Sequence, residues 1–134
     1  MAADDEEPLE IDIAAMFGAV PRHGERFAIY VPSADREGKP IGQKEWVDQA
    51  MEILSDIGGG ATAMPPVDGA WRNEQGRLIR ERPIVVYSSI IPEKFIEHGD
   101  ALVLFVKRMG RETNQGDVAI EFDGVMYYVS DFGE

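Results

Sequence analysis

The stretch that decides the predicted fold is residues 58–91, GGGATAMPPVDGAWRNEQGRLIRERPIVVYSSII. Its leading glycines are predicted to end a helix at Gly58, because glycine adopts the left-handed conformation of a helix stop without a steric penalty. Two extended segments follow, over 61–72 and 77–90, joined by a tight turn. Pro65 and Pro66 cannot donate ladder hydrogen bonds, so the first segment is predicted to be an edge strand or to leave the sheet there.

Two amphipathic helices flank this hairpin. Apolar residues recur at three- and four-residue spacing across 43–57, which predicts a helix with one buried stripe. Pro92 suits the first turn of a second helix, which is predicted to continue to Gly110. The run 101–106 is almost wholly apolar, so we expect this helix to be deeply buried.

Strands complete the pattern at both ends of the chain. Residues 27–31 alternate in polarity and are followed by a proline, which indicates a strand. Residues 118–122 and 125–129 surround Asp123-Gly124, a strong signal for a hairpin with a two-residue turn. That turn sets a register in which the pairs Phe122–Val125, Ile120–Tyr127 and Val118–Val129 share the face expected to meet the core.

The element order predicts an α+β domain: a ferredoxin-like βαββαβ antiparallel sheet with an extra C-terminal strand and two helices on one face. Residues 25–134 would form this domain, behind an acidic tail at 1–24. The opposite sheet face would show Tyr30, Met126 and Tyr128, with Trp71 a further candidate. Because large exposed apolar patches mark interaction sites, we expect a homodimer or a protein partner on that face.

Composition limits the classes of function. The 134 residues fit one domain. The 25 acidic side chains outnumber the 13 basic ones, for a net charge of -12, which argues against direct nucleic-acid binding. The chain has no cysteine, so disulfides and thiolate chemistry are excluded. No apolar run is long enough to cross a membrane, and the acidic start does not resemble a secretory signal, so a cytoplasmic location is expected.

Charge is unevenly placed within the chain. Arginines gather on the central hairpin, at Arg72, Arg77, Arg80 and Arg82. Pairing with acids of the same chain is the favoured interpretation, and an anion contact is the alternative. The acidic N-terminus leads into 9–17, whose apolar spacing fits a short helix. This segment is either a tail or a helix that binds a partner.

Two motifs carry a resemblance. The stretches GGGATAMPPVDGAW and GRETNQGDV, within residues 58–71 and 110–118, resemble a family of small bacterial proteins of unknown function. They are also similar to short bacterial secreted proteins of a domain family of unknown function, from which this chain departs in having no export signal. The resemblance supports the fold and implies no activity.

Chemistry is only weakly indicated. His23 and His98 do not have metal-ligand spacing, and no metal or cofactor is expected. Any small-molecule site is predicted where the loop at 111–116 approaches 62–72. The candidate residues are Thr62, Asp68, Trp71, Arg72, Glu112, Asn114, Gln115 and Glu121. The plainer interpretation is that 113–116 simply forms a turn, as its residue types would.

Three functions therefore stay open. The leading one is a non-enzymatic accessory or protein-interaction subunit, working through the aromatic sheet face and the acidic tail. The second is a small-ligand or enzymatic pocket at the residues just named. The third is a DNA-mimicking inhibitor, which requires acids along one face at roughly the 7 Å spacing of phosphates.

Overall fold

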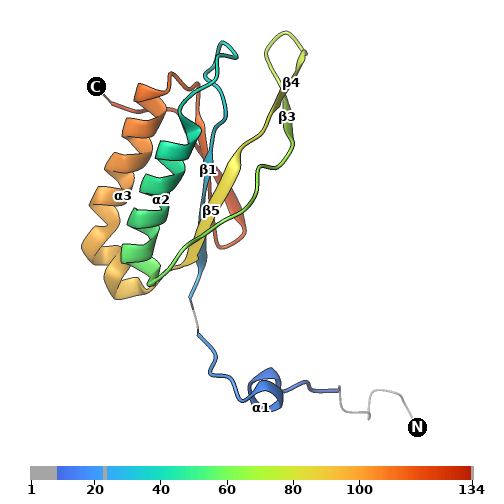
Figure 1. Ribbon diagram of the computed structural model, residues 1–134, viewed down its shortest axis with the longest axis vertical. Coiled ribbons are helices and arrows are strands. Elements are labelled where there is room, and N and C mark those ends of the chain that lie inside the picture. Colours follow the sequence, from blue (N-terminus) through green and yellow to red (C-terminus); the bar gives the residue numbers. More distant parts are fainter. Residues whose placement is uncertain (1–8, 23, 134) are drawn as a thin grey trace.

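The computed structural model describes residues 9–22 and 24–133, and its centre is a five-stranded antiparallel sheet. The strand order is β2-β5-β1-β6-β7, with both long helices on one side of the sheet (Figure 1). The elements of this layer pair are β1 (Arg26–Val31), α2 (Gln43–Gly58), β2 (Thr62–Ala63), β5 (Ile84–Ser89), α3 (Pro92–Glu112), β6 (Val118–Phe122) and β7 (Val125–Val129). The predicted α+β class is confirmed, and the last strand lies beside β6 as expected.

The core lies between the sheet and the two helices. Phe27, Ile29 and Val31 alternate along β1 toward the helices and are buried. The α2 stripe meets them through Leu54 and Ile57, neither of which has any exposed surface. Burying such side chains contributes about 1.5–3 kcal/mol each, so the amphipathic pattern accounts for the placement of both helices.

The two helix ends differ in detail from the prediction. Gly58 is the last residue of α2, and Gly59 is the residue that adopts the left-handed conformation, at φ 80°. Helix α3 runs two residues past Gly110, to Glu112. None of the helices in the described part of the chain combines the length and apolar character needed to cross a bilayer.

The central hairpin is divided between two sheets. Its outer part forms a separate two-stranded ribbon, β3 (Gly69–Arg72) with β4 (Leu78–Glu81), which projects beyond the main sheet (Figure 1). The first extended segment therefore leaves the main sheet, one of the two outcomes predicted from its prolines, whereas the expected single return strand over 77–90 is wrong. The strands break where Pro65, Pro66 and Pro83 lack the N–H needed for ladder bonding. Trp71 consequently lies on this ribbon rather than on the open face of the main sheet.

The C-terminal hairpin has the predicted register. Val118 pairs with Val129, Ile120 with Tyr127, and Phe122 with Val125. Asp123 and Gly124 have φ of 51° and 80°, as a tight hairpin turn requires. The expectation that all six side chains meet the core is wrong for Val125 and Tyr127, which are about half exposed at 51% and 48%. Val129, at the other end of β7, packs against the core as expected.

A short helix, α1 (Ile13–Phe17), precedes the domain, as the apolar spacing predicted. The Asp12 side chain caps it by accepting a hydrogen bond from the Ala15 N–H at 2.9 Å. The acidic tip at 1–8 and His23 lie outside the described residues. The division into a tail to residue 24 and a domain from 25 stays a prediction.

Candidate functional site

One row of side chains crosses the whole sheet on the face without helices. Thr62 pairs with Tyr87, and Tyr87 pairs with Ala28. Ala28 pairs with Glu121, which in turn pairs with Met126. Residues directly opposite one another in antiparallel strands point to the same side. The register therefore brings an aromatic ring, a carboxylate and a thioether to one surface, with the small Ala28 between the first two.

Neighbouring positions on this face add charge and two more phenols. The guanidinium carbon of Arg26 lies 3.7 Å from the centre of the Tyr87 ring. Glu121 is close enough to Tyr30 for its negative charge to raise the pKa of the Tyr30 hydroxyl. Tyr128 is close enough to act electrostatically on Tyr30 and is itself 65% exposed. We call the group Arg26, Tyr30, Tyr87, Glu121 and Tyr128 the open-face cluster.

Electrostatics within the open-face cluster favours the neutral form of the Tyr30 phenol. Burial raises the pKa of Tyr30, and the negative charge of Glu121 raises it further, while Arg26 acts in the opposite direction. A phenol that keeps its proton remains a hydrogen-bond donor at all physiological pH values. Tyr30 therefore offers a hydrogen-bond donor beside Glu121, whose side chain is half-buried.

The chemistry of the open-face cluster suits a small molecule with a flat ring and charged groups. Tyrosine faces stack against heteroaromatic rings and attract cations. A half-buried carboxylate binds positive charge more strongly than an exposed one, because water screens it less. Arg26 presents a planar donor that matches a carboxylate. None of these side chains is a typical redox group or an activated nucleophile.

The predicted site residues on the central hairpin do not join this cluster. Asp68, Trp71 and Arg72 lie on or beside the β3–β4 ribbon, where all three are exposed. Arg72 donates to the Gly76 carbonyl across its own turn at 2.8 Å. Asp68 forms a 3.4 Å ion pair with Arg82. Only Thr62 of the predicted 62–72 group lies on the helix-free face, at the edge next to Tyr87.

The loop after α3 has a structural role. The buried Gln115 amide donates to the Ala34 carbonyl at 2.8 Å and to the Thr113 carbonyl at 3.2 Å. Asn114 adopts φ 51° and its carbonyl accepts from the Arg36 N–H. Glu112 forms an exposed ion pair with Arg108 at 3.7 Å. The prediction that this loop meets 62–72 at one site is wrong. The polar groups of the turn form hydrogen bonds with the loop at 34–36 instead.

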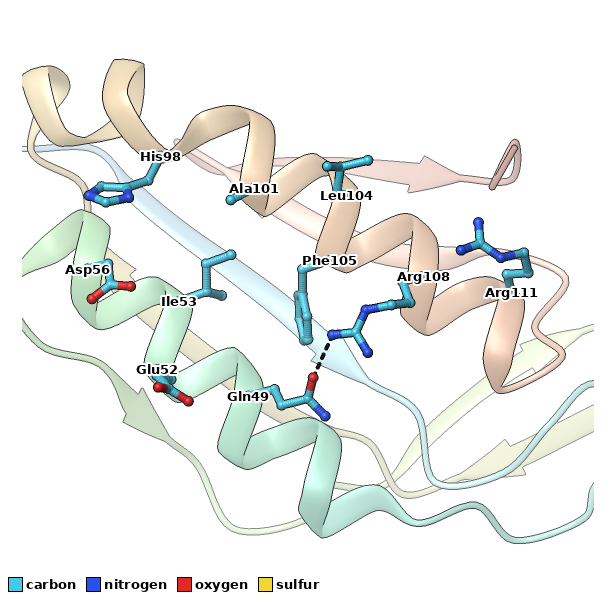
Figure 2. A pocket seen from close by; sticks show the side chains of 10 residues that line it. All are labelled: Gln49, Glu52, Ile53, Asp56, His98, Ala101, Leu104, Phe105, Arg108 and Arg111. Atoms are coloured by element: carbon cyan, nitrogen blue, oxygen red, sulfur yellow. Dashed lines mark hydrogen bonds between the residues drawn. The ribbon is translucent and has the colours of Figure 1, made fainter. Parts of the chain in front are cut away.

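A second concave region lies between the two helices, on the other side of the molecule (Figure 2). This groove has a volume of about 610 Å³. Figure 2 shows its acids, Glu52 and Asp56, along α2, and Arg108 and Arg111 along α3. Arg108 donates to Gln49 at 2.6 Å, and Arg111 donates to the Phe132 carbonyl at 2.9 Å. The arginines of the groove are therefore already engaged by the protein.

A smaller apolar cleft lies between α3 and the last two strands. Its volume is about 250 Å³, and Lys107 is the one charged residue among those lining it. The remaining lining residues are Phe27, Phe95, Leu102, Val103, Val106, Ile120 and Val129. In residues 9–22 and 24–133, no group of three or more acidic or histidine side chains is placed to hold a metal ion. The apolar cleft thus lacks the balanced charges of the open-face cluster, and the groove between the helices has such charges but its arginines already bond to the protein.

The sequence matches no protein-family model, and no curated protein matches it. Similar folds do occur among solved structures. One is a phage SAM lyase in complex with S-methyl-5'-thioadenosine, with 17% identity and a TM-score of 0.57 over 80% of this chain and 89% of that one. Another is a phage SAM lyase in the apo state, with 17% identity and a TM-score of 0.52 over 83% and 92% of the two chains. At this identity the likeness establishes the fold.

These neighbours correct the leading functional expectation. A non-enzymatic interaction subunit is contradicted, because the similar solved chains are an enzyme, one of them holding a small molecule. The DNA-mimic alternative gains nothing from them. The resemblance to small bacterial proteins of unknown function stays a prediction, since no family model tests it.

Sequence reasoning identified part of the open-face cluster and missed the rest. It named Glu121 as a site residue, and Tyr30 and Tyr128 as interface residues. It missed Arg26 and Tyr87. The signal for Tyr87 was available, because alternation along 84–89 places it on the same face as Val85 and Ser89. Its position relative to Glu121 was not, since that depends on which strand lies between them.

Proposed function

We propose that this protein is a small-molecule enzyme of the lyase type, which binds an adenosyl-sulfur compound on the helix-free face of its sheet. The observation that supports it most is the juxtaposition of Tyr87, Glu121 and Arg26 across three adjacent strands. The SAM lyase neighbours add a fold in which such a compound is bound. The proposed substrate class is S-adenosylmethionine (SAM) or a closely related sulfonium.

Each member of the open-face cluster has a role in this proposal. The tyrosine rings provide surfaces for the adenine base, a stacking contact that contributes about 1–3 kcal/mol per base in nucleic-acid sites. Glu121 binds the positive charge of the ligand, either the sulfonium or the amino group. Arg26 binds the carboxylate of an amino-acid side arm. Tyr30 is a positioning residue, because its hydroxyl lies near Glu121 on the same face of the sheet.

The reaction class is cleavage of a carbon–sulfur bond. When the bond from sulfur to the amino-acid arm breaks in SAM, its electron pair stays on sulfur, and one product is the neutral thioether S-methyl-5'-thioadenosine. The carbon that leaves sulfur forms a new bond to the carboxylate oxygen of the same arm, so the second product is the lactone of the amino-acid arm. The positive charge on sulfur decreases between the bound substrate and the transition state. A nearby carboxylate therefore stabilises the substrate more than the transition state. Glu121 is therefore assigned to binding and orientation of the cation, and not to acceleration of the bond-breaking step.

Paired ligands provide the test of binding. SAM carries the sulfonium charge, whereas S-methyl-5'-thioadenosine is neutral. Calorimetric titration of the wild-type protein is expected to show binding of both. Glu121→Gln should weaken SAM about tenfold, equivalent to about 1.4 kcal/mol, and leave S-methyl-5'-thioadenosine within about twofold. The matched control is Glu52→Gln, the same change in the groove between the helices, which should leave both affinities unchanged.

Two results would overturn the proposal. One is the absence of measurable binding of either compound at millimolar concentration. The other is loss of SAM binding in Glu52→Gln with Glu121→Gln unaffected, which would move the ligand to the groove of Figure 2. Turnover is measured separately, by chromatographic detection of S-methyl-5'-thioadenosine released from SAM. Binding without release would retain the ligand class and reject the lyase assignment.

We further infer, from the strand order alone, that the fold is a ferredoxin-like domain with the β3–β4 ribbon inserted between its second and third core strands. Self-association and a cytoplasmic location remain part of the same proposal. The exposed Met126 and Tyr128, at 38% and 65%, support self-association. Their place beside Glu121 means that a partner copy there would border the ligand.

A further inference from the structure

The N-terminal arm, residues 9–20, exposes an unusual amount of apolar surface. Its large apolar side chains are between 56% and 98% exposed: Leu9, Ile11, Ile13, Met16, Phe17 and Val20. Its single helix, α1, spans five residues and has no buried residue. A helix this short is not stable alone in water, and contiguous apolar surface of this kind marks a binding segment. The arm therefore needs a partner surface.

The arm leaves the domain at a defined place. Arg22 donates to the carbonyl of Gly58 and, at 3.5 Å, to that of Ser89. The Ile90 N–H donates to the Glu25 carbonyl at 2.9 Å. These contacts fix the root of the arm at the Ser89 end of β5, which is the lower end of the domain in Figure 1.

A complementary surface lies at the opposite end. The β3–β4 ribbon continues from the Ile84 end of β5 and extends away from the sheet at the top of Figure 1. On one face of the ribbon, Leu78 pairs with Arg72 and Arg80 pairs with Ala70. All four are exposed, so this face presents two apolar and two basic side chains to solvent. A two-stranded ribbon without further packing is only marginally stable, so it also gains from a partner.

The arm and the ribbon carry charges of opposite sign. The arm carries Glu10 and Asp12 next to its apolar side chains. On the ribbon, Arg82 already forms an ion pair with Asp68, whereas the guanidinium of Arg72 donates only to the Gly76 carbonyl within the described part of the chain. An acidic, apolar segment and a basic, apolar ribbon are the kind of surfaces that steer and hold each other.

The arm lies away from its own ribbon. Its root is at the Ser89 end of β5, whereas the ribbon continues from the Ile84 end, and the arm extends from the domain in the direction opposite to the ribbon (Figure 1). A ribbon that contacts the arm in this placement therefore belongs to another molecule.

We propose that the N-terminal arm of one copy docks on the β3–β4 ribbon of a second copy of this chain. Asp12 and Glu10 pair with Arg72 and Arg80, while Met16 and Phe17 pack on Leu78. Because arm and ribbon are different surfaces at opposite ends, the contact is head-to-tail. Such contacts close into a ring or continue as a chain, and do not form a twofold dimer.

Charge reversal tests the contact. Wild-type protein at about 50 µM is expected to be oligomeric in sedimentation equilibrium, and less so at high salt because screening weakens the ion pairs. The ribbon variant Arg72→Glu with Arg80→Glu, and the arm variant Glu10→Lys with Asp12→Lys, should each form smaller species than the wild type, with no further dissociation at high salt. An equimolar mixture of the two should regain oligomers. The control, Lys44→Glu with Lys94→Glu, makes the same charge change as the ribbon variant on α2 and α3 and should behave as wild type.

Several outcomes would reject the docking. A wild-type monomer at this concentration rejects it, as does an oligomer whose size is unchanged by both reversals. A mixture that stays monomeric rejects the specific pairing. A monomer in which Phe17→Ala alters hydrogen exchange of the α3 cleft would place the arm on its own domain instead. None of these measurements involves a ligand, so they are independent of the proposed lyase function.

Discussion

Gly58 and Ser89 pack so closely that no side chain fits between them. A Cβ on Gly58 would lie 2.5 Å from the Ser89 carbonyl oxygen, and the neighbouring Ser88 side chain lies closer still. Because the obstacle includes backbone of the central strand β5, it cannot rotate away. The end of α2 is thereby held directly against the sheet, beside the root of the N-terminal arm.

Gly58→Ala is accordingly expected to destabilise the protein by about 1–3 kcal/mol, the usual cost of forcing extra atoms into a packed interior. Gly60→Ala is the matched control, since a Cβ there meets nothing within 4 Å and the residue has no positive φ. That control should be neutral or slightly stabilising. Urea unfolding followed by circular dichroism measures both, and equal midpoints for the two variants would contradict the packing account.

Ionisation of Tyr30 is expected to lower the free energy of unfolding at alkaline pH. Its folded-state pKa is raised above the ordinary value of 10.0, chiefly by burial and then by Glu121. The folded form therefore retains the proton after the unfolded form has lost it. This contribution is fully present below pH 10 and is lost as pH rises through the folded pKa. Wild type should lose stability more steeply than Tyr30→Phe between pH 9.5 and 11, measured by urea midpoints at each pH. Parallel curves would contradict the assignment.

Glu81 is expected to be a destabilising residue at neutral pH. Burial raises its pKa, and the nearby negative charge of Asp117 raises it further. A group with a raised folded pKa contributes stability only below its unfolded pKa, and this is lost as pH rises. Glu81→Gln should therefore stabilise the protein at pH 7, by about 1 kcal/mol or less, and have little effect near pH 4. Glu74→Gln, on the exposed turn of the same ribbon, is the control, and thermal melts at both pH values provide the comparison.

Gln115 is expected to matter for stability and not for ligand binding. Its buried amide donates to two backbone carbonyls, those of Ala34 and Thr113. Gln115→Ala leaves both without that donor and should cost about 1–3 kcal/mol. The exposed neighbour Glu112→Ala should cost less than about 0.5 kcal/mol. Calorimetric affinity for S-methyl-5'-thioadenosine should be unchanged in the folded fraction of each variant, and a selective loss in Gln115→Ala would return this loop to the site.

Local sequence patterns predicted most of the secondary structure. The stripe through Trp46, Leu54 and Ile57 lies in the core, and the Asp123-Gly124 turn sets the pairing of the last two strands. Such features depend on neighbours within a few residues, so periodicity and turn chemistry are enough to predict them. The break of the central hairpin was predicted only in part. The prolines indicated that the first segment could leave the sheet, but nothing in the sequence indicated a second sheet.

The candidate site was harder to predict because its members come from distant strands. Arg26, Tyr87 and Glu121 come together only because β1 lies between β5 and β6. A one-residue slip in either pairing would turn Tyr87 or Glu121 toward the helices. The predicted contact between the loop at 111–116 and the central hairpin was wrong, because it too depended on tertiary structure. The loop satisfies its polar groups on residues 34–36, a contact that no local pattern announces.

By itself the amino-acid sequence determined where helices, turns and the last hairpin occur, and it ruled out cysteine chemistry. Only the tertiary structure decided that a tyrosine, a glutamate and an arginine share one surface, and that an apolar arm and a basic ribbon lie at opposite ends. The physical reason is range. Backbone preference and polarity act between near neighbours, whereas strand order and register are settled by packing of the whole core, which brings together residues almost a hundred positions apart in the chain.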